Sequence, residues 1–307
     1  MKKHLSTNII LLPIFFFLLQ GCAVIAINPP PESDFSVMAW NIWHGGREDG
    51  EEVGPQRVIR VIKNSRADII AMQETYGSGE LISEALGFNF LPRGTNVSIM
   101  SRFPILEDIS VYHEFKCVGA IIELPDKTPL AFYSIWLPYD TEIWEVGTRE
   151  GKSKEELLAA CASSASDLEQ ILTLAKTKLA ESNYADAPII IAGDFNSMSH
   201  LDYTENAIDQ YEYVIEWPTS KYITAAGFTD SYREHYPTVN RKLGSTWSPR
   251  FPNQQQDRID FIYYSNNSMK SVKSVKYDRP VESHDLLNEP ATFPSDHAAL
   301  ITRFLHE

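Results

Sequence analysis

Short runs of large apolar residues recur along most of the chain and predict strands. One such run extends from Phe35 to Ile42. Others of similar length occupy residues 68–74, 97–101, 109–115, 119–124, 130–136, 187–196, 258–264, 272–277 and 298–304. Apolar runs of this length, bounded by polar or turn residues, are typical of strands that lie in a core.

Helical spacing is found in fewer segments. Apolar positions 58, 61 and 62 follow Pro55, and a short stretch over 81–86 stops at Gly87. The longest predicted helix spans Lys154–Ala180. Many strands with few helices favour an α/β fold in which a two-layer β-sandwich is flanked by helices. Residues 35–307 contain no repeat or polar linker, so we expect one domain there.

The N-terminus has the features of an export signal. A basic head, Met1-Lys2-Lys3-His4, precedes an apolar run from Ile9 to Leu19. The following Leu19-Gln20-Gly21-Cys22 resembles a bacterial lipobox, in which the cysteine is acylated and becomes the new N-terminus. An uncleaved membrane-spanning helix over Ile9–Ile27 is the alternative, and Pro13 disfavours it.

This interpretation divides the chain into a lipoprotein signal peptide (1–21), a lipidated Cys22 with a proline-rich spacer (22–34), and the domain. The domain is then held outside the cytoplasm, in the cell envelope, by its lipid anchor. Cys117 and Cys161 remain as thiols. They could pair in an oxidising compartment, but their spacing does not bring them together, and separate buried thiols are favoured.

The charge balance bears on the partners. The chain has 307 residues and a formal net charge of −14. An acidic surface repels polyanions unless cations screen it, and no cluster of Lys and Arg with aromatic residues is present in the sequence. Tight nonspecific binding of nucleic acid is therefore disfavoured, although a nuclease with its own metal stays possible. Nothing in the sequence suggests an obligate dimer.

Several predicted strands end abruptly in Asn, Glu, Asp or His. Strand ends meet at one edge of a sheet core, so these polar side chains can share a site although they are distant in sequence. Asp194 and Asn196 are two residues apart, and on an extended backbone both point to the same side. The full set is Asn41, Glu74, Asp194, Asn196, Asp260, Asp296 and His297.

These residue types suit phosphoester hydrolysis. Mg²⁺ prefers one or two carboxylates together with retained waters, and it neutralises charge on the phosphoryl oxygens. A carboxylate can orient or deprotonate the attacking water. An imidazole beside an acid can stay charged and stabilise the phosphoryl group.

Five motifs carry a family resemblance. In chain order they are Trp40-Asn41-Ile42, Gln73-Glu74-Thr75, Gly193-Asp194-Phe195-Asn196-Ser197, Arg258-Ile259-Asp260-Phe261-Ile262 and Ser295-Asp296-His297-Ala298. They resemble the ordered motif set of the endonuclease/exonuclease/phosphatase superfamily. The resemblance covers nearly all of residues 35–305, and it is specific for the superfamily but much less so for the substrate. It implies a DNase I-like, four-layer α/β/β/α fold and a phosphoesterase that uses Mg²⁺, with Mn²⁺ as a substitute.

The resemblance also implies roles around the metal. Glu74 is the principal metal ligand, Asn41 helps to hold the metal region and a phosphoryl oxygen, and Asp296 lies near the metal. The number of ions and the identity of the formal base stay open.

Further roles concern the reacting groups. The resemblance implies that Asp194 orients or deprotonates the water and that Asn196 donates to the phosphate. Asp260 accepts a hydrogen bond from His297, which we expect to stabilise the transition state. Asp260 could instead form a structural ion pair with Arg258.

Other residues are candidates for substrate binding. His44 and Arg47 lie in a glycine-containing loop after Asn41. His44 could contact substrate or metal, or simply bond to its own backbone, and Arg47 could bind a second phosphate. Trp136 stands where many relatives have His or Tyr, so proton donation from that strand is in doubt and Tyr139 could reach the site instead. Trp247 could stack on substrate, or it could be an ordinary buried residue.

We therefore expect an enzyme that hydrolyses a phosphoester outside the cytoplasm, with lipid or small-molecule substrates favoured. A membrane-tethered nuclease is the second interpretation. A non-catalytic binding protein of the same fold is the third, and the intact polar set argues against it.

Overall fold

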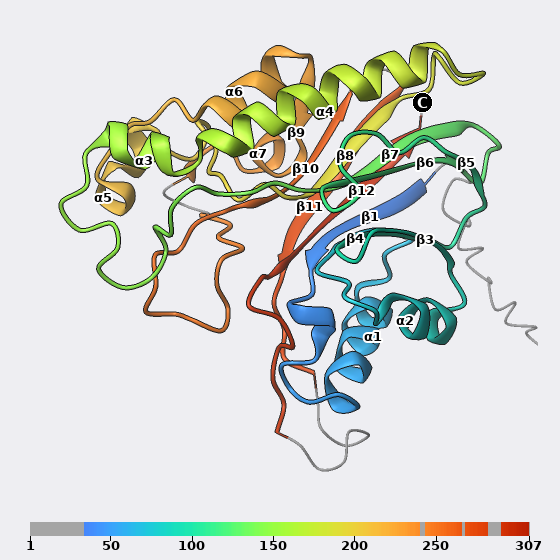
Figure 1. Ribbon diagram of the computed structural model, residues 1–307, viewed down its shortest axis with the longest axis horizontal. Coiled ribbons are helices and arrows are strands. Elements are labelled where there is room, and N and C mark those ends of the chain that lie inside the picture. Colours follow the sequence, from blue (N-terminus) through green and yellow to red (C-terminus); the bar gives the residue numbers. More distant parts are fainter. Residues whose placement is uncertain (1–33, 240–242, 266–267, 282–289, 307) are drawn as a thin grey trace, which may run out of the picture. The chain divides into compact units, whose positions relative to one another are not determined.

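Two sheets pack against each other in the computed structural model, which describes residues 34–306 apart from 240–242, 266–267 and 282–289 (Figure 1). These residues belong to one compact unit of the chain. The signal peptide and Cys22 of the sequence interpretation lie outside the described residues. No helix in the described ranges is long and apolar enough to cross a bilayer.

The first sheet has six strands within the described part, in the order β11-β12-β1-β2-β4-β3. β1 and β2 are parallel, and the other neighbours are antiparallel. Their bounds are β1 Asp34–Asn41, β2 Ile69–Gln73, β3 Asn89–Arg93, β4 Val97–Ser101, β11 Met269–Tyr277 and β12 Ala299–His306.

The second sheet also has six described strands, in the order β5-β6-β7-β8-β10-β9. β7 and β8 are parallel, and the remaining pairs are antiparallel. Their bounds are β5 Ile105–Asp108, β6 Cys117–Glu123, β7 Pro129–Trp136, β8 Ile189–Asp194, β9 Phe228–Asp230 and β10 Asp260–Ser265.

Alternating side chains on the strands build three apolar layers. On β1, Val37 and Ala39 face the core between the sheets, whereas Met38 and Trp40 pack under the helices on the outer side. Those outer helices are α1 (Val53–Ser65) and α2 (Gly79–Leu86). The second sheet is covered on its outer face by α4 (Ala162–Ala180) and α6 (Pro218–Ala225).

The remaining helices lie in the connections and include α3 (Lys154–Ala160), α5 (Ile208–Tyr211), α7 (Ser231–His235), and the 3₁₀ turns η1 (His44–Gly46) and η2 (Glu205–Ala207). Helices on both outer faces of two packed sheets confirm the predicted α/β/β/α sandwich (Figure 1).

The predicted strand over 109–115 is wrong. The chain forms β5 earlier, and residues 109–116 follow an irregular path. The Arg93 guanidinium donates to the carbonyls of Val111, Tyr112 (2.9 Å) and Cys117 (2.7 Å). Because this side chain satisfies backbone acceptors that a neighbouring strand would otherwise bind, the segment needs no partner strand.

The long helix predicted over Lys154–Ala180 is broken at Cys161, where φ is −123° and ψ is 22°. Asp140, from the loop after β7, causes the break. Its backbone N–H donates to the Ala160 carbonyl (2.7 Å), and its carboxylate accepts from the Ser163 N–H (2.8 Å). The loop after β7 therefore binds the last carbonyl of α3 and caps the first turn of α4. The Cys117 and Cys161 thiols are buried and separate, as expected.

Candidate active site

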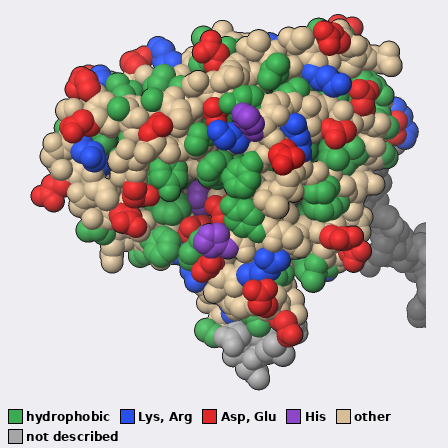
Figure 2. All heavy atoms as spheres, viewed as in Figure 1, with side chains coloured by type: hydrophobic (Ala, Val, Ile, Leu, Met, Phe, Trp, Pro, Cys, Tyr) green, Lys and Arg blue, Asp and Glu red, His purple; other side chains and the backbone are tan. Residues whose placement is uncertain are grey.

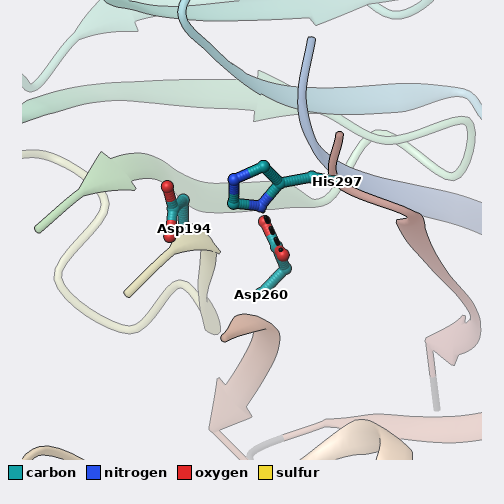
Figure 3. A group of neighbouring side chains, drawn as sticks. All are labelled: Asp194, Asp260 and His297. Atoms are coloured by element: carbon teal, nitrogen blue, oxygen red, sulfur yellow. Dashed lines mark hydrogen bonds and ion pairs between the residues drawn. The ribbon is translucent and has the colours of Figure 1, made fainter. Parts of the chain in front are cut away.

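The predicted polar residues converge because their strands share one edge of the sandwich. β1, β2 and β8 end there, and β12 and β10, the antiparallel neighbours of β1 and β8, begin there. Asn41 and Glu74 come from the first sheet, and Asp194 and Asp260 come from the second. Figure 3 shows Asp194, Asp260 and His297 as neighbours, with one His297 nitrogen toward Asp260 and the other ring edge toward Asp194.

Asn41 joins the two sheets at the site. Its amide nitrogen lies 3.0 Å from Oε1 of Glu74 and 3.1 Å from Oδ2 of Asp194, and it donates to both carboxylates. Its amide oxygen accepts from the Trp43 N–H at 3.0 Å. The amide nitrogen of this buried side chain is therefore used to position the two acids, and its oxygen keeps a second lone pair.

Glu74 is held in an uncommon backbone conformation. Its φ is 54°, in the left-handed region, and its N–H donates to Oδ1 of Asn96 (2.8 Å). The carboxylate accepts from Asn41 and, through Oε2, from the His44 backbone N–H at 2.9 Å. The strand end thus fixes the Glu74 side chain while its carboxylate still borders the cavity.

Asp194 and Asn196 form a tight turn after β8. The Asn196 N–H donates to Oδ1 of Asp194 (3.0 Å), and the Asn196 side-chain amide donates to Oδ2 (3.0 Å). The same amide donates to the Leu137 carbonyl at 2.9 Å. Asn196 has a φ of 42°. In this arrangement Asn196 orients Asp194 and still lines the cavity.

His297 and Asp260 form the predicted pair. Nδ1 of His297 lies 2.9 Å from Oδ2 of Asp260, and both residues are buried. The His297 backbone is anchored to the first sheet, since its carbonyl accepts from the Trp40 indole N–H at 2.9 Å. Burial would lower the pKa of the imidazole, but the charges of Asp260 and Asp194 outweigh burial and raise that pKa well above its usual value.

Two further carboxyl groups have raised pKa values. Burial raises the pKa of Asp194 to about 7, opposed by the charge of His297 and reinforced by that of Asp260. Burial raises the pKa of Asp296 to about 6, opposed by His297 and reinforced by Glu74. The acids crowd together with one imidazole between them, so negative charge is in excess.

This excess fits a divalent cation. Oxygen donors of Glu74 and Asp296 border the cavity, and Mg²⁺ binds to few carboxylates and keeps its waters. Ligand atoms of Asp194, Asp260 and His297 also lie within 4.8 Å of one another. A protonated imidazole cannot bind a metal, however. Because the pKa of His297 is raised, we expect the ion to bind on the side of the site that holds Glu74.

The acids open into a cavity of about 210 Å³. Figure 2 shows hydrophobic side chains around histidines and acids in the hollowed centre of one face. The lining residues are Trp43, His44, Glu74, Trp136, Tyr139, Glu142, Trp144, Asp194, Asn196, Trp247, Ile259, Asp296 and His297.

The proposed substrate residues divide into two groups. Four of them border the cavity: His44, Trp136, Tyr139 and Trp247. The Trp247 ring lies edge-on to His297, with 5.0 Å between ring centroids. Arg47 is not among the lining residues. Its guanidinium donates to the Tyr76 carbonyl (2.8 Å) and pairs with Glu51 (3.1 Å).

The His44 ring bonds to a side chain of its loop, and not to its own backbone as the alternative supposed. Its Nδ1 lies 2.6 Å from Glu48, and its Nε2 lies 3.9 Å from Glu74. The hydrogen bond to Glu48 raises the pKa of His44, burial opposes this, and the charge of Glu74 adds to it.

The alternative ion pair between Arg258 and Asp260 is wrong. Arg258 is buried and binds two other acids, Asp202 (2.8 Å) and Asp230 (2.7 Å). Asp202 comes from the chain after β8, and Asp230 comes from β9. The Asp260 carboxylate therefore pairs with His297 and not with Arg258.

Sequence reasoning assigned no role to four lining residues, Trp43, Glu142, Trp144 and Ile259. Trp43 directly follows the first motif, and its aromatic character next to a strand end was a usable signal. Glu142 and Trp144 lie in the irregular segment between β7 and α3, which carries no periodic pattern.

Comparison with known proteins identifies the family. The model of the Endonuclease/Exonuclease/phosphatase family matches residues 38–297, and the chain belongs to this family. Its members are hydrolases that act on phosphoester bonds. An uncharacterized Caenorhabditis elegans protein is 29% identical over 247 residues, which cover 74% of this chain and 77% of that protein.

Two other matches bear on the breadth of the family. The CCR4-Not complex 3'-5'-exoribonuclease subunit Ccr4 of Debaryomyces hansenii is 32% identical over 149 residues, 45% of this chain and 17% of that protein. An AP endonuclease from Archaeoglobus fulgidus has the same fold, with a TM-score of 0.57 at 16% identity, over 87% of this chain and 98% of that one.

Proposed function

We propose that this chain is a Mg²⁺-dependent phosphoesterase that hydrolyses a small-molecule or lipid phosphoester, with Mn²⁺ as a substitute ion. The observation that carries the proposal is the meeting of Glu74, Asp194 and the His297–Asp260 pair in one cavity. A family member that had lost its chemistry would have no reason to keep so many buried, mutually repelling acids.

In this mechanism Asp194 receives the proton of the attacking water. A base whose pKa lies near neutrality can accept that proton and release it again, and burial gives Asp194 a pKa of about 7. The Asn41 and Asn196 amides both donate to Oδ2 of this carboxylate and hold it in place.

His297 stabilises the charge that develops on the phosphoryl oxygens. Asp260 binds Nδ1 of the ring and keeps it charged, so the other nitrogen is available as a donor to the phosphoryl group. As the water oxygen bonds to phosphorus, the bond from phosphorus to the alcohol oxygen breaks. The departing alkoxide takes its proton from solvent, because the Trp136 indole cannot supply one.

Glu74 and Asp296 would hold the ion, which supplies further neutralisation of phosphoryl charge when it is bound. The charges of these two acids and the open cavity beside them support this placement.

A small or lipid substrate is supported by the net charge of −14 and by the cavity lining, which within the described residues has no Lys or Arg. A nuclease is the second candidate. It is supported by the partial likeness to the exoribonuclease subunit Ccr4.

We also propose that the chain is a lipoprotein of the cell envelope, anchored through Cys22 and facing away from the cytoplasm. The basic head, apolar run and Leu19-Gln20-Gly21-Cys22 support this proposal. Labelled palmitate should be incorporated into the full chain and not into Cys22→Ser.

The activity is tested with the full chain in detergent and bis-p-nitrophenyl phosphate. Turnover should require Mg²⁺ or Mn²⁺, stop with EDTA, and fall at least about 100-fold in Asp194→Asn, which keeps the side-chain shape. Asp209→Asn, at an exposed position, is the matched control. Metal-independent turnover, or no turnover on a panel of mono- and diesters, would refute the proposal.

A further inference from the structure

One wall of the cavity is built from residues that the proposed reaction does not use. Trp136, Tyr139, Glu142 and Trp144 all border the cavity and come from a single segment that leaves β7. The Tyr139 and Trp144 rings meet edge-on, 5.5 Å apart at 83°. Trp144 is buried, whereas Tyr139 is 44% exposed. The wall therefore offers aromatic surface to anything that enters.

The wall begins at the catalytic acids and extends to Glu142. Burial raises the pKa of Tyr139, and the charges of Glu142, Asp194 and Glu74 add to that effect in this order. The Tyr139 hydroxyl is thus within electrostatic reach of both the reacting centre and Glu142. A phosphoester bound at Asp194 would place one of its alcohol substituents along Tyr139.

Glu142 is fixed by its own loop and keeps one oxygen unused. Its Oε1 accepts from the backbone N–H groups of Trp144 (2.6 Å) and Glu145 (3.1 Å). Its Oε2 has no hydrogen-bond partner among the described residues. The loop therefore presents a stationary negative charge beside the aromatic rings.

The charge of the cavity lining determines which alcohol substituents of a phosphoester fit beside Glu142. Glu74, Asp194 and Asp296 can be offset by the ion and His297, but no Lys or Arg within the described lining offsets Glu142. A second phosphate or a carboxylate would be repelled by Glu142. An apolar group would cover the carboxylate without pairing it, at a cost in desolvation. A cationic group would pair with Glu142 and lie against the aromatic faces.

We propose that the wall formed by Trp136, Tyr139, Glu142 and Trp144 binds a positively charged alcohol substituent of the phosphoester, of the quaternary ammonium class. Aromatic faces, Trp above all, attract such cations within about 6 Å of the ring centroid. This inference rests on the proposed function, since it concerns the substrate of the same site.

The test compares two esters of equal size. The choline ester of 4-nitrophenyl phosphate carries the cation, and the 3,3-dimethylbutyl ester replaces its nitrogen by carbon. Phosphorus NMR follows cleavage of either ester bond by the full chain with Mg²⁺. We expect kcat/KM to be about tenfold higher for the choline ester, the size of a typical cation–π contact with a nearby acid. A ratio below threefold overturns the inference.

Two variants test whether the wall causes the preference for the choline ester. Glu142→Gln keeps an acceptor for the Trp144 and Glu145 N–H groups and removes the charge, so the ratio of the two esters should fall to below threefold. Glu145→Gln is the control, because Glu145 is exposed and does not border the cavity. An unchanged ratio in Glu142→Gln, with the fold verified by its thermal transition, contradicts the inference.

A second readout uses the cation alone. Tetramethylammonium chloride should inhibit cleavage of the dimethylbutyl ester competitively, and sodium chloride at the same ionic strength should not. Equal inhibition by the two salts would contradict binding of the cation by the wall. If neither ester is cleaved with Mg²⁺ or Mn²⁺, the proposed function itself fails, and that outcome is distinct from cleavage of both esters at equal rates.

Discussion

Nδ1 of His297 lies 2.9 Å from Oδ2 of Asp260, and the pair is buried between the ends of β10 and β12. Asp260 therefore decides two properties of the imidazole, its orientation and its charge. The raised pKa of His297 depends on the carboxylate, since burial alone would lower it.

Replacing the carboxylate by an amide should separate these properties. In Asp260→Asn the ring keeps a neighbour of the same shape, but its pKa falls. We expect kcat to drop on the order of 10²-fold, the usual cost of losing one stabilising donor. Steady-state kinetics measure the loss, and NMR titration of the His297 ring measures the pKa. Activity within threefold of the original, with an unshifted ring titration, would refute the assigned role.

The stability of the metal-free protein should fall as the pH rises. The carboxyls of Asp194 and Asp296 have pKa values of about 7 and 6, above their ordinary 3.8, and the pKa of His297 is raised above 6.5. The folded state therefore binds more protons than the unfolded chain from about pH 4 to beyond pH 7, and stability is lost through that window.

Urea unfolding in EDTA at pH 5.5 and pH 8 measures this effect. Mg²⁺ should restore more stability at pH 8, where the acids are ionised. Asp194→Asn should show a weaker pH dependence. Equal stability at both pH values in EDTA would contradict the raised pKa values.

Arg258 should matter for stability more than any surface cation. It is buried and pairs with Asp202 and Asp230, so Arg258→Met takes one cation away from each acid, of which Asp202 keeps its pair with Arg233. We expect a loss of about 3–5 kcal/mol in the free energy of unfolding. The control, Lys221→Met, removes an exposed pair with Glu216 and should cost less than about 1 kcal/mol. Similar losses in the two variants would show that the buried ion pairs of Arg258 contribute no more to stability than an exposed pair.

Gly193 allows β7 and β8 to approach closely beneath Asp194. Its φ is +148°, and an added Cβ would lie 2.0 Å from the Ile135 carbonyl oxygen. Gly193→Ala should therefore destabilise the protein by at least about 3 kcal/mol. Gly147→Ala also has a positive φ, +83°, but has open space around it, and should cost about 1–2 kcal/mol. Thermal unfolding of both variants measures the difference, and equal losses would argue against the backbone contact.

The strand ends were predictable because two signals coincide there. An apolar run such as 187–193 predicts a buried strand, and the polar residues that follow, Asp194 and Asn196, would be costly at its end without a purpose. The pairing of His297 with Asp260 followed from the family resemblance and is present in the structure.

The loops were not predictable, because distant contacts determine their paths. Arg149 holds the segment after β7 by donating to the Ile143 carbonyl (3.0 Å) and to the Tyr203 hydroxyl (2.6 Å). No local sequence pattern predicts such contacts, so Glu142 and Trp144 were not identified as lining residues. The break at Cys161 was missed for the same reason, since Asp140 from another segment produces it.

The site is divided between the two sheets, with Asn41 and Glu74 on one and Asp194 and Asp260 on the other. Neither half holds a working set, so a partly folded chain that has formed only one sheet should be inert. Enzyme activity would then report the docking of the halves, and during refolding it should recover no earlier than the last tertiary contact between them.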